Sequence, residues 1–313
     1  MPQQHPFHFG VTLPQIKRTW QEVRDAATAF DAYGFDSVWA CDHIYGVPMP
    51  TLPIFEAWSQ LAAVAAITEN VGLGTLVTPP FFRNPAVLAK QVATIDHISN
   101  GRTIMGLGAG WFEPEFVQTG CAFPPLGQRM KALEETAQIL KGLWTEERFS
   151  LAGEHFRVTE AVSEPKPVRR PPILIGGTGE KVLMGIVARH ADIWNNMAVT
   201  QGLLGQKVEA LKRRCDDEKR DFGTLQVSQQ CVVVIAKTDP LAKTALEKAQ
   251  KIYGGHMGAA LEEHGIWGTP PQVVAGIERH RKLGCTGFVI EFFGRDTRVP
   301  AQLFAEEVMP ALR

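Results

Sequence analysis

The sequence is poor in cysteine and has no excess of charge of either sign. Its 313 residues include five cysteines, and no two of them form a C-x-x-C pair. A disulfide framework or a zinc site needs paired cysteines, so neither is expected, and the odd number favours a reducing cytoplasm. Lys and Arg number 32 against 33 Asp and Glu. This balance argues against a nucleic-acid-binding protein.

Long apolar runs are also missing. No stretch of about 18 apolar residues occurs, and residues 1–15 lack the charged start and apolar run of a signal peptide. We therefore expect no membrane segment, a cytoplasmic location, and a small molecule as the partner. Hydrophobic residues still make up 45% of the chain, which is enough for a large core.

The sequence does contain a regular alternation of strand-like and helix-like segments. The strand candidates are residues 7–13, 35–40, 71–77, 102–108, 173–177, 191–196, 225–236 and 286–293. Helical spacing of apolar residues follows at 20–33, 55–68, 85–99, 129–144, 180–190, 203–220, 240–253, 271–283 and 304–312. Eight strand–helix units predict a (β/α)8 TIM barrel. We expect one domain over 1–313, with an excursion around 145–170.

An acid and an imidazole lie side by side where the second predicted strand ends, in the sequence WACDH. Chemistry in such barrels takes place at the C-terminal ends of the strands, so Asp42 and His43 are candidate site residues. The alternative is that Asp42 caps a turn and His43 packs in the rim. Because adjacent residues of an extended chain point in opposite directions, we do not expect these two to pair directly.

Two further strand ends are rich in glycine. GLGAGW (106–111) follows the fourth strand and GGTGEK (176–181) follows the fifth. Neither fits a dinucleotide-binding or P-loop pattern, and both could be plain tight turns. The second runs into the helix predicted from Glu180, whose free N–H groups would favour a phosphate.

Taken in order, these segments resemble the bacterial-luciferase-like superfamily. The resemblance rests on FGVTLPQ, GFDSVWACDH, the stretch from GLGTLVTPPFFRNP to GLGAGW, EPKPVRRPPILIGGTGEKVL and ARHADIWNN. It is continuous from about residue 7 to 196. Within the superfamily, the chain is most similar to oxidoreductases that use the deazaflavin coenzyme F420.

The resemblance implies a flavin-like cofactor in the barrel mouth, with His43 as proton donor. No metal site is expected. The resemblance also implies a non-prolyl cis peptide within residues 75–77. The cofactor contacts that it implies are Asp42, Thr75, Leu76, Val77, Thr78, Gly108, Ala109, Gly110, Trp111, Gly176, Gly177, Thr178, Gly179 and Glu180. F420 is the expected cofactor and FMN the alternative.

Three function classes follow from the resemblance: an F420-dependent oxidoreductase, a reduced-FMN monooxygenase and a non-catalytic flavin-binding barrel. Sugar-phosphate dehydrogenases of this kind carry an acid at the position of Trp111 and an asparagine at that of Pro114, which argues against sugar-phosphate oxidation. Glu113 and Glu115 receive no catalytic role. The sequences of loops 44–56, 112–127 and 254–268, which would shape the substrate pocket, do not indicate the substrate.

Some cationic and aromatic residues allow two interpretations. Lys166, Arg169 and Arg170 are expected in a solvated connector at the bottom of the barrel. Arg83 and Lys181 are better placed for an anionic cofactor tail, or are ordinary surface cations. The aromatic candidates for a flat-ring pocket, or for plain packing, are Trp39, Phe81, Phe82 and Trp111. The resemblance also implies a homodimer through helices 55–68 and 85–99.

Overall fold

The computed structural model describes residues 7–47, 49–257 and 261–313. The first six of the N-terminal residues considered for a signal peptide, and parts of loops 44–56 and 254–268, lie outside the described residues. None of the helices that the structure describes is both long and apolar enough to cross a membrane.

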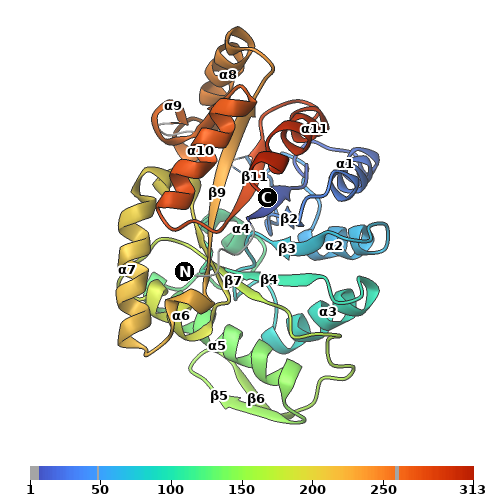
Figure 1. Cartoon of the computed structure of the whole chain (residues 1–313). Helices are drawn as coiled ribbons and strands as arrows, with labels where there is room; N and C mark the ends of the chain where they lie inside the picture. Colours follow the sequence, from blue (N-terminus) through green and yellow to red (C-terminus); the bar gives the residue numbers. More distant parts are fainter. Residues whose placement is uncertain (1–6, 48, 258–260) are drawn as a thin grey trace.

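Eight parallel strands close into a barrel, as the sequence predicts (Figure 1). They are β1 (His8–Thr12), β2 (Ser37–Ala40), β3 (Gly72–Thr75), β4 (Thr103–Leu107), β7 (Ile173–Gly176), β8 (Ile193–Asn196), β9 (Gln226–Ile235) and β11 (Gly287–Phe292). β11 pairs with both β9 and β1, and β8 pairs with β9, so the barrel has no open edge. Closure brings all C-terminal strand ends to one rim.

Helices surround the barrel (Figure 1). The longer ones are α1 (Trp20–Ala32), α2 (Ala57–Ala65), α3 (Pro85–Ile98), α5 (Leu126–Thr145), α6 (Leu183–His190), α7 (Leu204–Asp217), α8 (Asp239–Met257), α10 (Pro270–Lys282) and α11 (Arg298–Glu307). Local signals set several boundaries. The Asn84 side chain accepts from the N–H groups of Ala86 and Val87, and Pro85 occupies the first turn of α3.

The short elements were not predicted from the sequence. The excursion is an antiparallel hairpin of β5 (Phe149–Ala152) and β6 (Arg157–Ala161). Helix α4 (Glu113–Gln118), α9 (Leu261–His264) and β10 (Ile266–Gly268) lie within predicted loops. Such segments are too short to show a clear hydrophobic period.

Two predicted helix boundaries were wrong. The last helix was expected over 304–312, but α11 is Arg298–Glu307 and the single turn Met309–Ala311 follows it. Pro310 cannot continue a helix, because it lacks an N–H and restricts the residue before it. Helix α6 begins at Leu183 rather than at Glu180.

Trp39 fills the inside of the barrel. It is 1% exposed and packs with Ile104, Leu174, Ile193 and Val289. Two glycines make room for it: a Cβ at Gly10 would lie 2.3 Å from Trp39 Nε1, and one at Gly74 would lie 2.4 Å from its Cζ3. Trp39 is therefore a core residue.

The basic connector lies at the bottom of the barrel, as expected. Arg170 pairs with Asp192, just before β8, and Arg169 donates to the carbonyl of Gly101, before β4. These side chains are fixed by protein partners, so they tie the connector to the N-terminal ends of the strands.

Candidate active site

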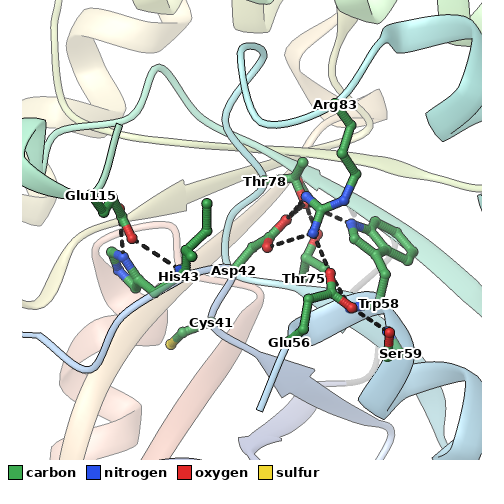
Figure 2. Close-up of polar contacts among 12 residues, drawn as sticks. Cys41, Asp42, His43, Glu56, Trp58, Ser59, Thr75, Thr78, Arg83 and Glu115 are labelled. Atoms are coloured by element: carbon green, nitrogen blue, oxygen red, sulfur yellow. Dashed lines mark hydrogen bonds and ion pairs between the residues drawn. The ribbon is translucent and has the colours of Figure 1, made fainter. Parts of the chain in front are cut away.

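Asp42 and His43 follow β2 and point in opposite directions (Figure 2). The Asp42 carboxylate faces Arg83 and Thr78, whereas the His43 ring faces Glu115. This confirms that the two neighbours do not pair with each other.

The Asp42 carboxylate is fully engaged by protein donors. Its Oδ2 accepts from Arg83 Nη1 at 2.6 Å and from the Thr78 hydroxyl at 2.7 Å, and its Oδ1 accepts from Arg83 Nη2 at 3.0 Å. The residue is only 3% exposed. Burial raises the pKa of Asp42, and the Arg83 guanidinium and Thr78 hydroxyl oppose that rise.

Arg83 is an internal counter-ion. It pairs with Glu56 as well as Asp42, and Glu56 also caps α2 by accepting from the N–H groups of Trp58 and Ser59. The interpretation of Arg83 as an ordinary surface cation was therefore wrong, and its assignment to a cofactor tail stays a prediction. The group connects the ends of β2 and β3 to the start of α2.

His43 is oriented by Glu115, a residue to which the sequence analysis gave no role. The His43 Nδ1 lies 2.9 Å from Glu115 Oε1, and Glu115 Oε2 accepts from the backbone N–H of Ile44 at 3.0 Å. Glu115 is 1% exposed, while the His43 side chain is 20% exposed. Among the described residues, the second ring nitrogen of His43 has no hydrogen-bond partner.

The signal for Glu115 was present but ambiguous. Glu115 lies on α4, which follows β4, so the barrel brings it to the rim that carries His43. Helix α4 has only six residues, and its first turn carries Glu113 as well as Glu115. Sequence spacing does not distinguish the exposed Glu113 from the buried Glu115.

The end of β3 forms the floor of the mouth. The Leu76–Val77 peptide is cis, as expected from the family resemblance. Val77 packs between two glycines: a Cβ at Gly108 would lie 2.3 Å from Val77 Cγ2, and one at Gly176 would lie 3.1 Å from Cγ1. Leu76 and Val77 both pack on the inner barrel cluster.

Thr75 and Thr78 are buried beside this floor. The Thr75 hydroxyl donates to the carbonyl of Gly106, and the Thr78 hydroxyl accepts from Trp58 Nε1 at 3.0 Å. Their side chains therefore hold β3 against its neighbours.

The stretch after β4 turns sharply toward the mouth. Gly110 has a φ of +76°, and a Cβ there would lie 2.7 Å from Phe116. Arg129 donates to the carbonyl of Gly110 and, at 3.5 Å, to that of Ala109. Trp111 is 50% exposed and meets the His43 ring edge-on, with the ring centroids 6.0 Å apart.

The stretch after β7 offers free backbone donors. Gly177 has a φ of +134°, and its N–H donates to the carbonyl of Asn195. In the part of the chain that the structure describes, the N–H groups of Thr178, Gly179 and Glu180 donate to no protein acceptor. The Glu180 carboxylate pairs with Lys207 at 2.7 Å, so only the backbone of Glu180 is open to an anion.

These features suit a flat ring that carries a phosphate. Ile193 faces the inside of the barrel and Trp194 the outer core, so strand alternation directs Asn195 inward beside Gly176. The Asn195 Oδ1 is buried and accepts from no residue that the structure describes, and it would accept an N–H from a ring. Val77 supplies an apolar floor, and the free N–H groups after β7 supply phosphate donors.

The phenylalanines before α3 are packing residues. Phe82 meets Phe116 with centroids 4.5 Å apart, and Phe81 packs against His155 and Phe156 of the excursion. Trp111 is the one member of the aromatic candidate set that the structure places next to His43. No cluster of three or more possible metal ligands occurs among the described side chains.

A family model described as luciferase-like monooxygenase matches residues 4–265. The chain belongs to the luciferase-like monooxygenase family. This confirms the superfamily resemblance seen in the sequence, and it makes the chain an oxidoreductase of that family.

The curated relatives of this chain include an uncharacterized protein of Mycobacterium tuberculosis. It is 36% identical over 205 residues, which cover 60% of this chain and 71% of the relative. An F420-dependent glucose-6-phosphate dehydrogenase of Amycolatopsis mediterranei is 26% identical over 322 residues, which cover 94% of this chain and 95% of the relative.

Several solved structures have the same fold as this chain. An F420-dependent secondary alcohol dehydrogenase, in complex with an F420-acetone adduct, has a TM-score of 0.84 and 21% identity, covering 99% of this chain and 100% of that one. The monooxygenase RslO1 of Streptomyces bottropensis has a TM-score of 0.82 and 21% identity, covering 98% and 100%. The two have different activities, so the barrel alone does not determine the reaction.

Proposed function

We propose that the chain transfers a hydride between the deazaflavin coenzyme F420 and a small organic substrate. The observation that carries the proposal is the His43–Glu115 pair at the mouth. One ring nitrogen of His43 is held by a buried carboxylate, and the other has no partner among the described residues. A relative aligned over 94% of this chain is an F420-dependent dehydrogenase, which supports the choice of cofactor.

The roles of the chain's own residues follow from this geometry. When bound, the deazaflavin supplies a ring carbon that accepts or gives a hydride. His43 would give or take the accompanying proton at Nε2, because Glu115 occupies Nδ1 and thereby sets the tautomer. Asp42 would act as a positioning residue, since its carboxylate reaches the floor of the mouth only through Thr78.

The residues that would hold the cofactor lie around the same mouth. Val77, Gly108 and Gly176 would support the flat face of the ring, and Asn195 would accept an N–H from its edge. The N–H groups of 178–180 would bind the phosphate. The contact set implied by the resemblance, which extends to Ala109, Gly110 and Trp111, stays a prediction.

We do not extend the substrate of the glucose-6-phosphate dehydrogenases to this chain. Trp111 and Pro114 replace the acid and the asparagine of the resembling enzymes. A small alcohol or carbonyl compound is the better starting point for assays, since a structural neighbour is a secondary alcohol dehydrogenase.

A binding experiment tests the cofactor. Purified apo-protein is titrated with oxidised F420 and, separately, with FMN, and binding is followed by fluorescence. We expect micromolar or tighter binding of F420 and much weaker binding of FMN. Tight FMN binding with no F420 binding, accompanied by oxygen consumption when reduced FMN is supplied, would instead support a monooxygenase.

Turnover separates an enzyme from a binding protein. With F420 bound, a panel of small secondary alcohols and aldehydes is screened by the visible absorption of the cofactor. F420 binding without a change in absorption for any compound would favour the non-catalytic flavin-binding barrel.

We also propose a homodimer through α2 and α3. Apolar side chains are exposed on or beside these two helices, with Ile67 37%, Val87 64% and Ile98 48% exposed. Burial of such side chains would favour association. Light scattering at micromolar concentration tests the proposal, and a monomer would contradict it.

A further inference from the structure

A third acid lies at the barrel mouth, apart from Asp42 and Glu115. Glu291 is the fifth residue of β11, near its C-terminal end. Val289 belongs to the inner barrel cluster, while Phe288, Ile290 and Phe292 belong to the outer core. Strand alternation therefore directs Glu291 into the mouth.

Tyr253 of α8 closes one side of this acid. Its hydroxyl donates to Glu291 Oε1 at 2.6 Å, and its ring meets Phe293 edge-on with centroids 6.3 Å apart. One Glu291 oxygen is thereby occupied, and no hydrogen bond from a described residue reaches the other.

Cys41 lies near the same acid. It follows β2 two residues after the inward-facing Trp39, and β1 is the only strand between β2 and β11. Burial, with the nearby Glu291 and Asp42 carboxylates, raises the pKa of Cys41 to about 12. Figure 2 shows that Cys41 points away from both the Asp42 and His43 clusters.

Glu291 has no protein counter-ion among the described residues. No lysine, arginine or histidine whose side chain the structure describes forms an ion pair with it, and Arg18, whose charge acts on Tyr253, pairs with Glu22. Burial raises the pKa of Glu291, and the Tyr253 hydrogen bond offsets part of that rise. Glu291 is half-buried, and a partly desolvated acid with one open oxygen is best matched by a cation that can donate hydrogen bonds.

We propose that Glu291, with the Tyr253 hydroxyl and the Cys41 thiol beside it, binds the ammonium group of an amine substrate in the barrel mouth. The inference rests on the proposed function in treating the mouth as a substrate site. The open Glu291 oxygen accepts from the ammonium, and Tyr253 keeps the carboxylate in place. An anionic substrate group is repelled at this wall, in keeping with the exclusion of sugar phosphates.

The test uses three probes that share a ring and differ in charge: benzylammonium, benzyl alcohol and benzoate. Each is titrated into cofactor-free protein by calorimetry. We expect benzylammonium to bind at least about tenfold more tightly than the other two, as a charge-assisted hydrogen bond in a desolvated site would give. Glu291→Gln should abolish that preference. Glu147→Gln removes one exposed acid elsewhere and should leave the preference unchanged.

A second readout needs no variant. Cys41 is half-buried but its pKa is raised, so a small and strongly thiol-reactive reagent, methyl methanethiosulfonate at pH 8, is used to label it slowly, and Cys121, also half-buried, is the internal reference. Benzylammonium should slow labelling of Cys41 relative to Cys121, measured by mass spectrometry, whereas benzoate should not. This measurement decides the question even if the Glu291 variant fails to fold.

Several results would overturn the proposal. These are binding of benzyl alcohol or benzoate as tight as that of benzylammonium, a preference that survives in a folded Glu291→Gln variant, no binding of any probe at millimolar concentration, or no protection of Cys41. Because the protein is cofactor-free, a failure to bind F420 counts against the proposed function and leaves this test intact.

Discussion

Two acids at the barrel mouth have opposite environments. Asp42 is 3% exposed, and its two oxygens accept three hydrogen bonds, two of them from Arg83. Glu291 accepts one hydrogen bond, from a neutral tyrosine, and has no counter-ion among the described residues. A saturated acid fixes the positions of the chain segments that contact it. An acid with an open oxygen can bind a ligand, at a cost in stability.

The largest effect is expected from removing the counter-ion of Asp42. Arg83→Met keeps an apolar stem but leaves Asp42 buried without its counter-ion. Loss of one partner of a buried ion pair costs about 3–5 kcal/mol, so the free energy of unfolding should fall by that order. Urea unfolding measures it. Arg298→Met, which breaks the exposed pair with Asp296, is the control and should cost under about 1 kcal/mol. Equal effects of the two changes would show that the Asp42 network is not structural.

The next effect concerns the proton at His43. His43→Ala should lower kcat by about 10²-fold or more, because a positioned acid or base contributes at least that much. Cofactor affinity should remain nearly unchanged. His97→Ala removes a histidine that contacts the backbone of Lys166 in the bottom connector, and it should leave kcat unchanged. Unchanged turnover in the His43 variant would make His43 a packing residue.

A smaller effect is expected from the residue that orients His43. Glu115→Gln keeps the shape but cannot accept from both His43 Nδ1 and the Ile44 N–H, so kcat should fall about tenfold. The pH dependence of kcat should also change, which a purely structural role would not produce. Glu113→Gln, two residues earlier on the exposed side of α4, should change neither property. Matching results for the two variants would contradict the orienting role.

The smallest effect is expected from changing Glu291, and it should be a gain in stability rather than a loss. Because burial raises the pKa of Glu291, the folded state binds that proton more tightly than the unfolded chain does. Glu291 is therefore best tolerated at acid pH, and it becomes destabilising as the pH rises above the ordinary range of a glutamate.

Glu291→Gln removes this cost and keeps an acceptor for Tyr253. We expect it to stabilise the protein by about 1 kcal/mol or less at pH 8, because Glu291 is half-buried and solvent relieves part of the cost, and by less still near pH 4. Urea unfolding at the two pH values checks this. A loss of stability at pH 8 as large as that of Arg83→Met would remove the contrast between the two acids.

The sequence by itself determined the eight strand–helix units, the cap at Asn84 and the placement of Asp42 and His43 at a strand end. These features depend on hydrophobic period, on turn residues and on side chains that bond to their own neighbours, all of which are local in the chain. The opposite directions of Asp42 and His43 were predictable for the same reason, since alternation is a property of extended backbone.

Only the tertiary structure decided which partner each group has. Arg83 lies 41 residues from Asp42, Glu115 lies 72 from His43, and Tyr253 lies 38 from Glu291. Barrel closure brings the ends of β2, β3, β4 and β11 to one rim, and short segments such as α4 then select one acid of two. Hydrophobic period carries no information about that choice, because it fixes which face of an element is buried and not which polar groups meet across the rim.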